Sequence, residues 1–480
     1  MRTSQEVTKG ERWALLATII SNVGQLFLLL AFTRLVSREA FAVMAIANVA
    51  IGIPQLILQT GLSHSLFSQA ENDQEQLSTL FWLHLIFALS GSGLVILAAL
   101  PISDFYGGPF LKETIWLLSF TLVFEAIAAL YRVLLLKELN YSFLARVDIV
   151  AFVASGVTAF FLAFSGYGVF ALVAQVAARA VLRYLLLFSE GRQLFFPSLQ
   201  FNLASVKSHL NFAFSHIGER LSMWMATQVD VLLIGKLLGM EMLGVYEVFR
   251  RLLNRPPAAL GEMMERIALP LMARFKKRSI ILKRIYLSNI KLMVIMVFPI
   301  YGFIALFSKE LVPFLFGPFW KSHAPVFSFI ALAIAFQSVG HPLDNLLVAV
   351  GTIRRLLFWN LTFLPIHISL IWVGASRGLY GVTLLLFFSA VFISNPAYFL
   401  LLKQEILLGF REFLYPIFQV IGMVLLSSII PAVLVFGTAY LWSLLWAAGF
   451  FLLVYLLLTW WFLPSIWLWI LKFASFWKVN

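Results

Sequence analysis

The residues of this chain that could do chemistry are ionisable side chains inside long apolar segments. Arg250, Arg251 and Arg255 lie within about two turns of one predicted helix, and Arg179 lies near the middle of another. A charge at the centre of a bilayer costs at least about 2.5–3.5 kcal/mol, so such residues normally face a bundle interior or a wet cavity. Planar guanidinium groups suit phosphate and carboxylate oxygens. We therefore predict that these arginines bind an anionic substrate in a water-filled lumen.

Carboxylates in the same apolar segments are the predicted partners of these arginines. They are Glu125, Glu219, Asp230 and Glu247. Asp230 lies at a depth similar to that of Arg250 and Arg251, which predicts an ion pair in the second half of the chain. Glu125 and Arg179 also lie at similar depths and predict another pair in the first half. Such pairs could simply hold helices together. Alternatively, a carboxylate that a proton or another ion neutralises could couple transport to a gradient.

Prolines inside the apolar segments predict irregular helices next to the charges. Pro256 and Pro257 follow Arg255 directly, and a shift of about 202 positions places Pro54 on Pro256 as part of a weak internal repeat. Proline removes a backbone donor and clashes with the preceding turn. We expect helix breaks at Pro54, Pro256 and Pro257, because broken helices at mid-depth line cavities in transporters. A simple packing kink is the alternative.

The elements that must position these residues are membrane-spanning helices. The chain has 480 residues, of which 61% are hydrophobic, and apolar runs long enough to cross a bilayer recur from Trp13 to Leu463. The polar segments between them stay below about 25 residues, which is too short for a soluble catalytic domain. The pattern predicts an all-α polytopic membrane protein with about fourteen transmembrane helices. Their ranges are 13–33, 40–61, 78–100, 114–136, 147–165, 168–188, 210–238, 242–262, 285–307, 324–349, 354–375, 379–402, 413–437 and 440–463.

These helices are expected to form two parallel six-helix lobes around a central lumen, followed by two extra helices. The repeat aligns Arg34-Leu35 with Lys236-Leu237, and an even number of helices keeps both lobes in the same orientation. The predicted parts are an N-terminal lobe (1–190), a cytoplasmic linker (191–209), a C-terminal lobe (210–402), two additional transmembrane helices (403–463) and an interfacial tail (464–480).

The charge distribution predicts the topology and narrows the function. The net charge is +13, and about twenty Lys and Arg residues fall on the side of both termini, against about seven on the other side. This bias predicts cytoplasmic termini and gives no reason to expect a nucleic-acid partner. The chain has no cysteine and no HExxH, Walker or GxSxG motif, and its histidines are scattered. We therefore predict no catalytic residue, no metal site and no cofactor.

Several short segments, taken in order, resemble one family of membrane proteins. They are Arg34-Leu35-Val36-Ser37, Asp230-Val231-Leu232-Leu233-Ile234-Gly235, Leu243-Gly244-Val245-Tyr246, Leu269-Pro270-Leu271-Met272 and Leu315-Phe316-Gly317-Pro318-Phe319-Trp320. Through them the chain resembles, over nearly its whole length, the polysaccharide flippases of the multidrug/oligosaccharidyl-lipid/polysaccharide exporter (MOP) superfamily, in particular the colanic-acid Wzx branch. The resemblance implies a fold like those of MATE and MurJ.

The resemblance also implies a function. Such a protein passes an undecaprenyl-pyrophosphate-linked oligosaccharide (an O-antigen, capsule or exopolysaccharide repeat unit) across the bacterial cytoplasmic membrane by alternating access, with or without ion coupling. The implied partners are this lipid-linked substrate, membrane lipids, and the polymerase and chain-length proteins of a polysaccharide pathway. Two other functions stay open: a MATE-like drug or cation antiporter and, in a different class, a membrane glycosyltransferase or polysaccharide polymerase. The leading prediction is a transporter and not an enzyme.

Overall fold

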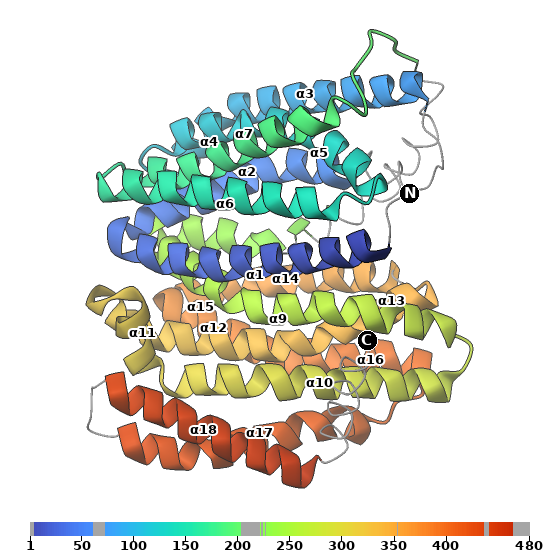
Figure 1. Cartoon of the computed structure of the whole chain (residues 1–480). Coiled ribbons are helices and arrows are strands. Elements are labelled where there is room, and N and C mark those ends of the chain that lie inside the picture. Colours follow the sequence, from blue (N-terminus) through green and yellow to red (C-terminus); the bar gives the residue numbers. More distant parts are fainter. Residues whose placement is uncertain are drawn as a thin grey trace. The chain divides into compact units, whose positions relative to one another are not determined.

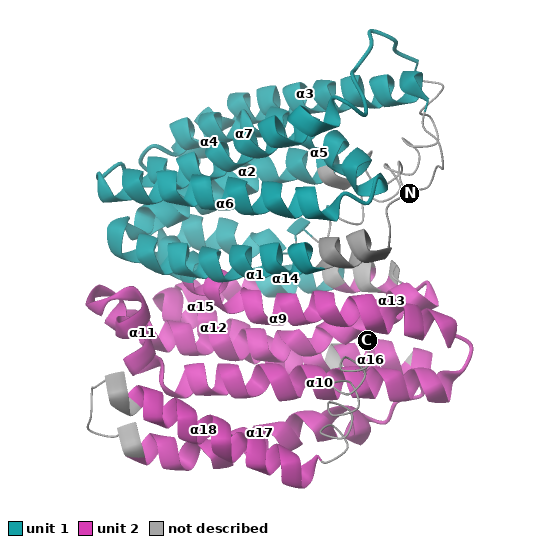
Figure 2. Ribbon diagram, in the orientation of Figure 1, with its two compact units in different colours: residues 1–248, 360–368 teal, residues 249–359, 369–480 magenta. Residues whose placement is uncertain are grey.

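The structure, a computed structural model, describes residues 4–60, 73–202, 221, 224–225, 227–352, 354–435 and 441–463. Throughout these ranges every regular element is a helix, as the apolar runs predict (Figure 1). The chain divides into two compact units, residues 1–248 with 360–368 and residues 249–359 with 369–480 (Figure 2). The lobe boundary predicted at 191–209 stays a prediction, because residues 203–220 lie outside the described ranges.

The first unit is built from the helices of the first half of the chain. Their bounds are α1 (Ser4–Leu35), α2 (Arg38–Thr60), α3 (Gln74–Tyr106), α4 (Leu111–Ser119), α5 (Thr121–Lys137), α6 (Tyr141–Phe164) and α7 (Val169–Gly191). Residues 227–238 are also helical, and α9 (Met240–Arg274) begins in this unit. α1 packs along α6, α6 along α7 and α7 along α5 (Figure 1). These contacts place α1, α5, α6 and α7 around one interior.

A buried apolar cluster holds α5 against α7. Tyr131 and Leu135 of α5 and Leu187 of α7 belong to it, together with Phe195. Gly191 allows the close approach, because a Cβ at this position would lie 2.5 Å from the ring of Tyr131. The cluster therefore fixes which residues of α5 and α7 lie opposite one another.

The second unit is built from the helices that follow α9. Their bounds are α10 (Ser279–Leu306), α11 (Ser308–Phe316), α12 (Ala324–Gln337), α13 (His341–Val350), α14 (Arg354–Ala375), α15 (Gly378–Ser389), α16 (Asn395–Ile406), α17 (Phe410–Val435) and α18 (Leu441–Phe462). Short 3-10 or π turns join some of them: η3 (Pro318–His323), η4 (Ser338–Gly340) and η5 (Ala390–Ser394). α10 packs against α12 and α17, and α17 packs against α18.

The apolar runs locate the membrane spans well. Eleven segments among the described residues are long and apolar enough to cross a membrane, and each coincides with a predicted span. The other predicted spans differ for separate reasons. α9 carries too many charges along its length, α14 has only the shorter apolar part Leu361–Ala375, and most of the span predicted at 210–238 lies outside the described residues.

The helix breaks predicted at proline are wrong. Pro54 lies inside α2, and Pro256 and Pro257 lie inside α9, and both helices continue through them. Proline frees only single backbone groups, which neighbouring helices, hydroxyl side chains and water can satisfy in a membrane protein. An interruption appears where no proline lies: the predicted helix 114–136 is divided at Phe120 into α4 and α5. A kink at the prolines stays a prediction.

Candidate functional site

A cavity inside the first unit gathers charged side chains from its apolar helices. It has a volume of about 440 Å³ and lies between α1, α5, α6 and α7. Its charged lining is Arg132 of α5, Asp148 of α6, and Arg179 and Arg183 of α7. Its polar lining on α1 is Thr18, Ser21, Asn22 and Gln25. Because Arg179 and Arg183 are four residues apart on α7, both point to the same side of the helix. We call this site the arginine cavity.

Asp148 is the centre of an ion-pair network in the arginine cavity. Its carboxylate accepts hydrogen bonds from both terminal nitrogens of Arg132, at 3.1 and 2.9 Å, and from Arg183 at 2.6 Å. The Asp148 side chain is only 17% exposed. A single carboxylate therefore serves two guanidinium groups, which leaves a positive excess and ties α5, α6 and α7 together.

Arg179 lines the same cavity, but it forms no ion pair with a carboxylate of the described residues. Its guanidinium lies 5.6 Å from the centre of the Phe152 ring, and its buried Nε has no hydrogen-bond acceptor in the described part of the chain. The Nε of Arg183 is unsatisfied in the same way. A buried donor without a partner costs free energy. The described part of the chain therefore leaves part of the hydrogen-bonding capacity of these two guanidinium groups, which line the cavity, unused.

Glu125 adds a second carboxylate to this charged neighbourhood. It accepts a hydrogen bond of 2.8 Å from the side-chain amide of Gln55 on α2. It also interacts electrostatically with Arg183 and Arg179. Within the described ranges, its direct contact is with Gln55, and no contact ion pair with Arg179 is formed. Glu125 thus lowers the positive potential around the arginines without occupying their donors.

Asp230 makes a hydrogen bond that its depth in the sequence does not predict. It is buried and accepts a hydrogen bond from the Tyr246 hydroxyl at the start of α9. Glu247, the next residue of α9, is also buried. Ion pairing of Asp230 with Arg250 or Arg251 stays a prediction, because these residues belong to different compact units.

The arginines of α9 stay a predicted substrate site. Arg250, Arg251 and Arg255 are half-buried, and Arg251 acts on Arg255 as a neighbouring like charge. Glu219, a predicted coupling residue, lies outside the described residues.

Arg179 is the charged residue of the arginine cavity that the sequence predicted as a site residue; Arg132 and Arg183 were not assigned to the site, and Asp148 was missed altogether. Asp148 lies second in the apolar segment predicted at 147–165, where an acidic residue indicates a helix end more than a group within the membrane. The signal that could have found it is the pair Arg179 and Arg183 on one face of a helix. Two cations on one buried face require an anion on a neighbouring helix.

These observations define the class of the protein: a polytopic helical membrane protein with a positively charged cavity inside one bundle. Its fold is similar to that of the lipid II flippase MurJ in an inward closed conformation, with a TM-score of 0.75 and 16% identity, covering 94% of this chain and 99% of MurJ. It is also similar to an inward-facing multidrug resistance MATE family transporter of the MOP superfamily, with a TM-score of 0.59 and 15% identity, covering 82% and 98% of the two chains. The predicted MATE- and MurJ-like fold is confirmed.

The sequence identifies the particular family. The family model described as "Polysaccharide biosynthesis protein" matches residues 31–325, and the chain belongs to this family. Among curated proteins it is similar to the lipopolysaccharide biosynthesis protein WzxC of Escherichia coli (strain K12), with 24% identity over 421 residues that cover 86% of this chain and 84% of WzxC. The resemblance to the Wzx branch is therefore confirmed.

Proposed function

We propose that this protein is a flippase that passes an undecaprenyl-pyrophosphate-linked oligosaccharide across the bacterial cytoplasmic membrane. The observation that carries the proposal is the arginine cavity, which is lined by Arg132, Arg179, Arg183 and one carboxylate, Asp148, that pairs with only Arg132 and Arg183. Membership of a polysaccharide biosynthesis family and similarity to WzxC support a polysaccharide repeat unit as cargo. The MurJ-like fold supports a lipid-linked one.

The chemistry of the cavity suits such a cargo. A pyrophosphate joined to a sugar cannot enter hydrocarbon unaided, because transfer of its charge out of water is very costly. In the arginine cavity, the guanidinium groups of Arg179 and Arg183 would take the place of water around phosphate oxygens. Asn22 and Gln25 of α1 would offer amide groups to sugar hydroxyls. The polyprenyl tail would stay in the bilayer throughout.

The transport cycle would use both halves of the chain. In this proposal the lobes predicted at 1–190 and 210–402 alternate in exposing the cargo site, with both termini in the cytoplasm. Arg250, Arg251 and Arg255 would supply the cations of the second lobe. Glu125, Glu219, Asp230 and Glu247 are the carboxylates through which a proton or sodium gradient would act. The polymerase and chain-length proteins of the pathway would receive the product.

Two observations disfavour the alternatives. A drug or cation antiporter needs a lumen that attracts cations, whereas the arginine cavity carries more guanidinium groups than carboxylates. A membrane glycosyltransferase or polymerase needs a sizeable extracytoplasmic loop for donor and acceptor. The predicted outside segments of this chain near 101–113 and 308–323 are short.

The decisive test is flipping of a fluorescent undecaprenyl-pyrophosphate sugar by the full chain reconstituted in vesicles. Arg179→Gln removes one charge from the cavity and keeps a polar side chain of similar length. A hydrogen bond to a charged group contributes about 1.5–3 kcal/mol, so we expect flipping to slow by about tenfold or more. Arg192→Gln is the matched control, because Arg192 is exposed just beyond the end of α7.

A flipping rate in Arg179→Gln equal to that of the wild type would refute the role of the arginine cavity. An equal loss in Arg192→Gln would point to total charge instead of this site. Transport of a cationic dye with no flipping of the lipid-linked sugar would favour the antiporter.

A further inference from the structure

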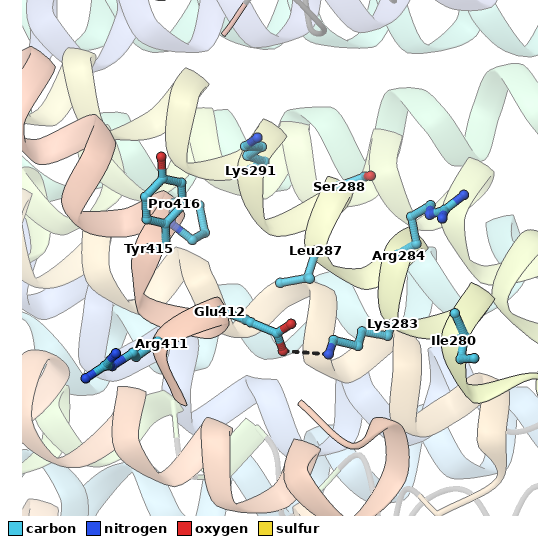
Figure 3. A pocket seen from close by; sticks show the side chains of 10 residues that line it. All are labelled: Ile280, Lys283, Arg284, Leu287, Ser288, Lys291, Arg411, Glu412, Tyr415 and Pro416. Carbon is cyan, nitrogen blue, oxygen red and sulfur yellow. Dashed lines mark ion pairs between the residues drawn. The ribbon is translucent and has the colours of Figure 1, made fainter. Parts of the chain in front are cut away.

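A second basic site lies in the other compact unit, in a groove between α10 and α17 (Figure 3). Its volume is about 690 Å³. The cations that line it are Lys283, Arg284 and Lys291 of α10 and Arg411 of α17, and its single lining carboxylate is Glu412 of α17. We call this site the basic groove.

The basic residues of α10 that line the groove are spaced so that they lie in one stripe along the helix. Lys283, Leu287 and Lys291 follow one another at intervals of four residues, and Arg284 and Ser288 form the adjacent row. Residues three or four apart lie on the same face of a helix. At about 1.5 Å per residue, the stripe extends about 12 Å along the helix from Lys283 to Lys291.

Most of the positive charge in the groove is uncompensated. Lys283 pairs with Glu412 at 2.5 Å across the gap between the helices (Figure 3). Glu412 also accepts a hydrogen bond of 2.9 Å from the Gly409 amide. Arg284, Lys291 and Arg411 make no ion pair or hydrogen bond with any part of the chain that the structure describes. The single acid of the groove is therefore already engaged.

The basic groove is bordered by apolar surface. Ile280 is 77% exposed and Tyr415 is 63% exposed, and Leu287 and Pro416 complete the apolar lining. A soluble anion needs only the cations and gains nothing from this surface. An amphiphile can place its charge on the cations and its chain on the apolar residues. The charge bias of the sequence predicts that this end of α10 faces the cytoplasm.

We propose that the basic groove binds the phosphate headgroup of an anionic phospholipid of the inner leaflet. Basic pockets between transmembrane helices on the cytoplasmic side are suited to such headgroups. The guanidinium of Arg284 and the ammonium of Lys291 contact the phosphate, and the acyl chain runs over Ile280 and Leu287. The bound lipid thereby neutralises cations of α10 in the groove beside α17. Such a site exists whether or not the protein flips a lipid-linked sugar.

The test measures binding of phosphatidylglycerol to the purified full chain in neutral detergent by native mass spectrometry, with phosphatidylcholine, which is zwitterionic and has no net charge, as the comparison. The variant is Arg284→Gln with Lys291→Gln. Each cation near a membrane surface attracts anionic lipid appreciably, so we expect about tenfold weaker binding or more. The matched control is Lys276→Gln with Lys277→Gln, which removes the same charge from exposed positions just before α10.

A second variant separates the site from any fault in folding. Glu412→Gln frees Lys283 for the lipid and keeps a hydrogen-bond acceptor for Gly409, so phosphatidylglycerol should bind more tightly by severalfold. Unchanged binding in the double variant, or an equal loss in its control, would overturn the proposal. Displacement of the lipid by millimolar inorganic phosphate would assign the site to a soluble anion instead. Preference for undecaprenyl pyrophosphate over phosphatidylglycerol would assign it to the transport substrate.

Discussion

The arginine cavity and the basic groove each contain one carboxylate among several cations, but the carboxylate has a different role in each. In the cavity, Asp148 is shared by two arginines from different helices and is only 17% exposed. In the groove, Glu412 is 49% exposed and engages only Lys283. Asp148 therefore holds the helices of the cavity together. Glu412 pairs with one of the four cations of the groove and leaves most of its positive charge uncompensated.

The residues that surround the cations also differ between the two sites. Polar side chains of α1, including Asn22 and Gln25, complete the cavity, whereas apolar residues such as Ile280 and Leu287 complete the groove. A hydrated sugar phosphate needs many hydrogen-bonding groups around its charge, and a phospholipid needs apolar surface beside it. The cations alone therefore do not determine which ligand a site binds. The choice of ligand also depends on whether the surrounding side chains are polar or apolar and on which cations are already paired.

The largest effect is expected from removal of the shared carboxylate in the cavity. Asp148→Asn would remove the carboxylate that pairs directly with two guanidinium groups, and we expect a loss of about 2–3 kcal/mol of stability, since both arginines are partly exposed. Thermal unfolding of the purified protein measures it. Asp104→Asn on the exposed end of α3 is the matched control. An unchanged midpoint for Asp148→Asn would mean that this network does not hold α5, α6 and α7 together.

A pair of glycine substitutions compares the packing behind the two sites. Gly191→Ala on α7 forces a Cβ to within 2.5 Å of the Tyr131 ring, so we expect a loss of about 1–3 kcal/mol. Gly422→Ala on α17 meets nothing within 4 Å and gains helix propensity, so a rise of up to about 1 kcal/mol is expected. Unfolding midpoints of both variants test this. Equal shifts would show that α5 and α7 are not tightly packed behind the cavity.

The sequence predicted the spanning helices because a bilayer imposes one length on every apolar run. It did not predict the interruption at Phe120 or the continuity of α9 through Pro256, because both depend on which neighbours satisfy the freed backbone groups. Arg179 was predicted as a site residue from its depth in an apolar segment. Asp148 was not predicted, because its role depends on ion pairs between α5, α6 and α7, which come together only in the folded bundle.

The smallest effect is expected from the ion pair of the basic groove. Lys283→Gln breaks the contact with Glu412, but exposed pairs gain little in water because solvent screens them and side-chain order offsets the attraction. We expect the unfolding midpoint to stay within measurement error, at both low and high salt. The same scans with Asp148→Asn supply the contrast. A drop for Lys283→Gln as large as that for Asp148→Asn would remove the distinction between the two sites, because Glu412 would then be a structural carboxylate like Asp148.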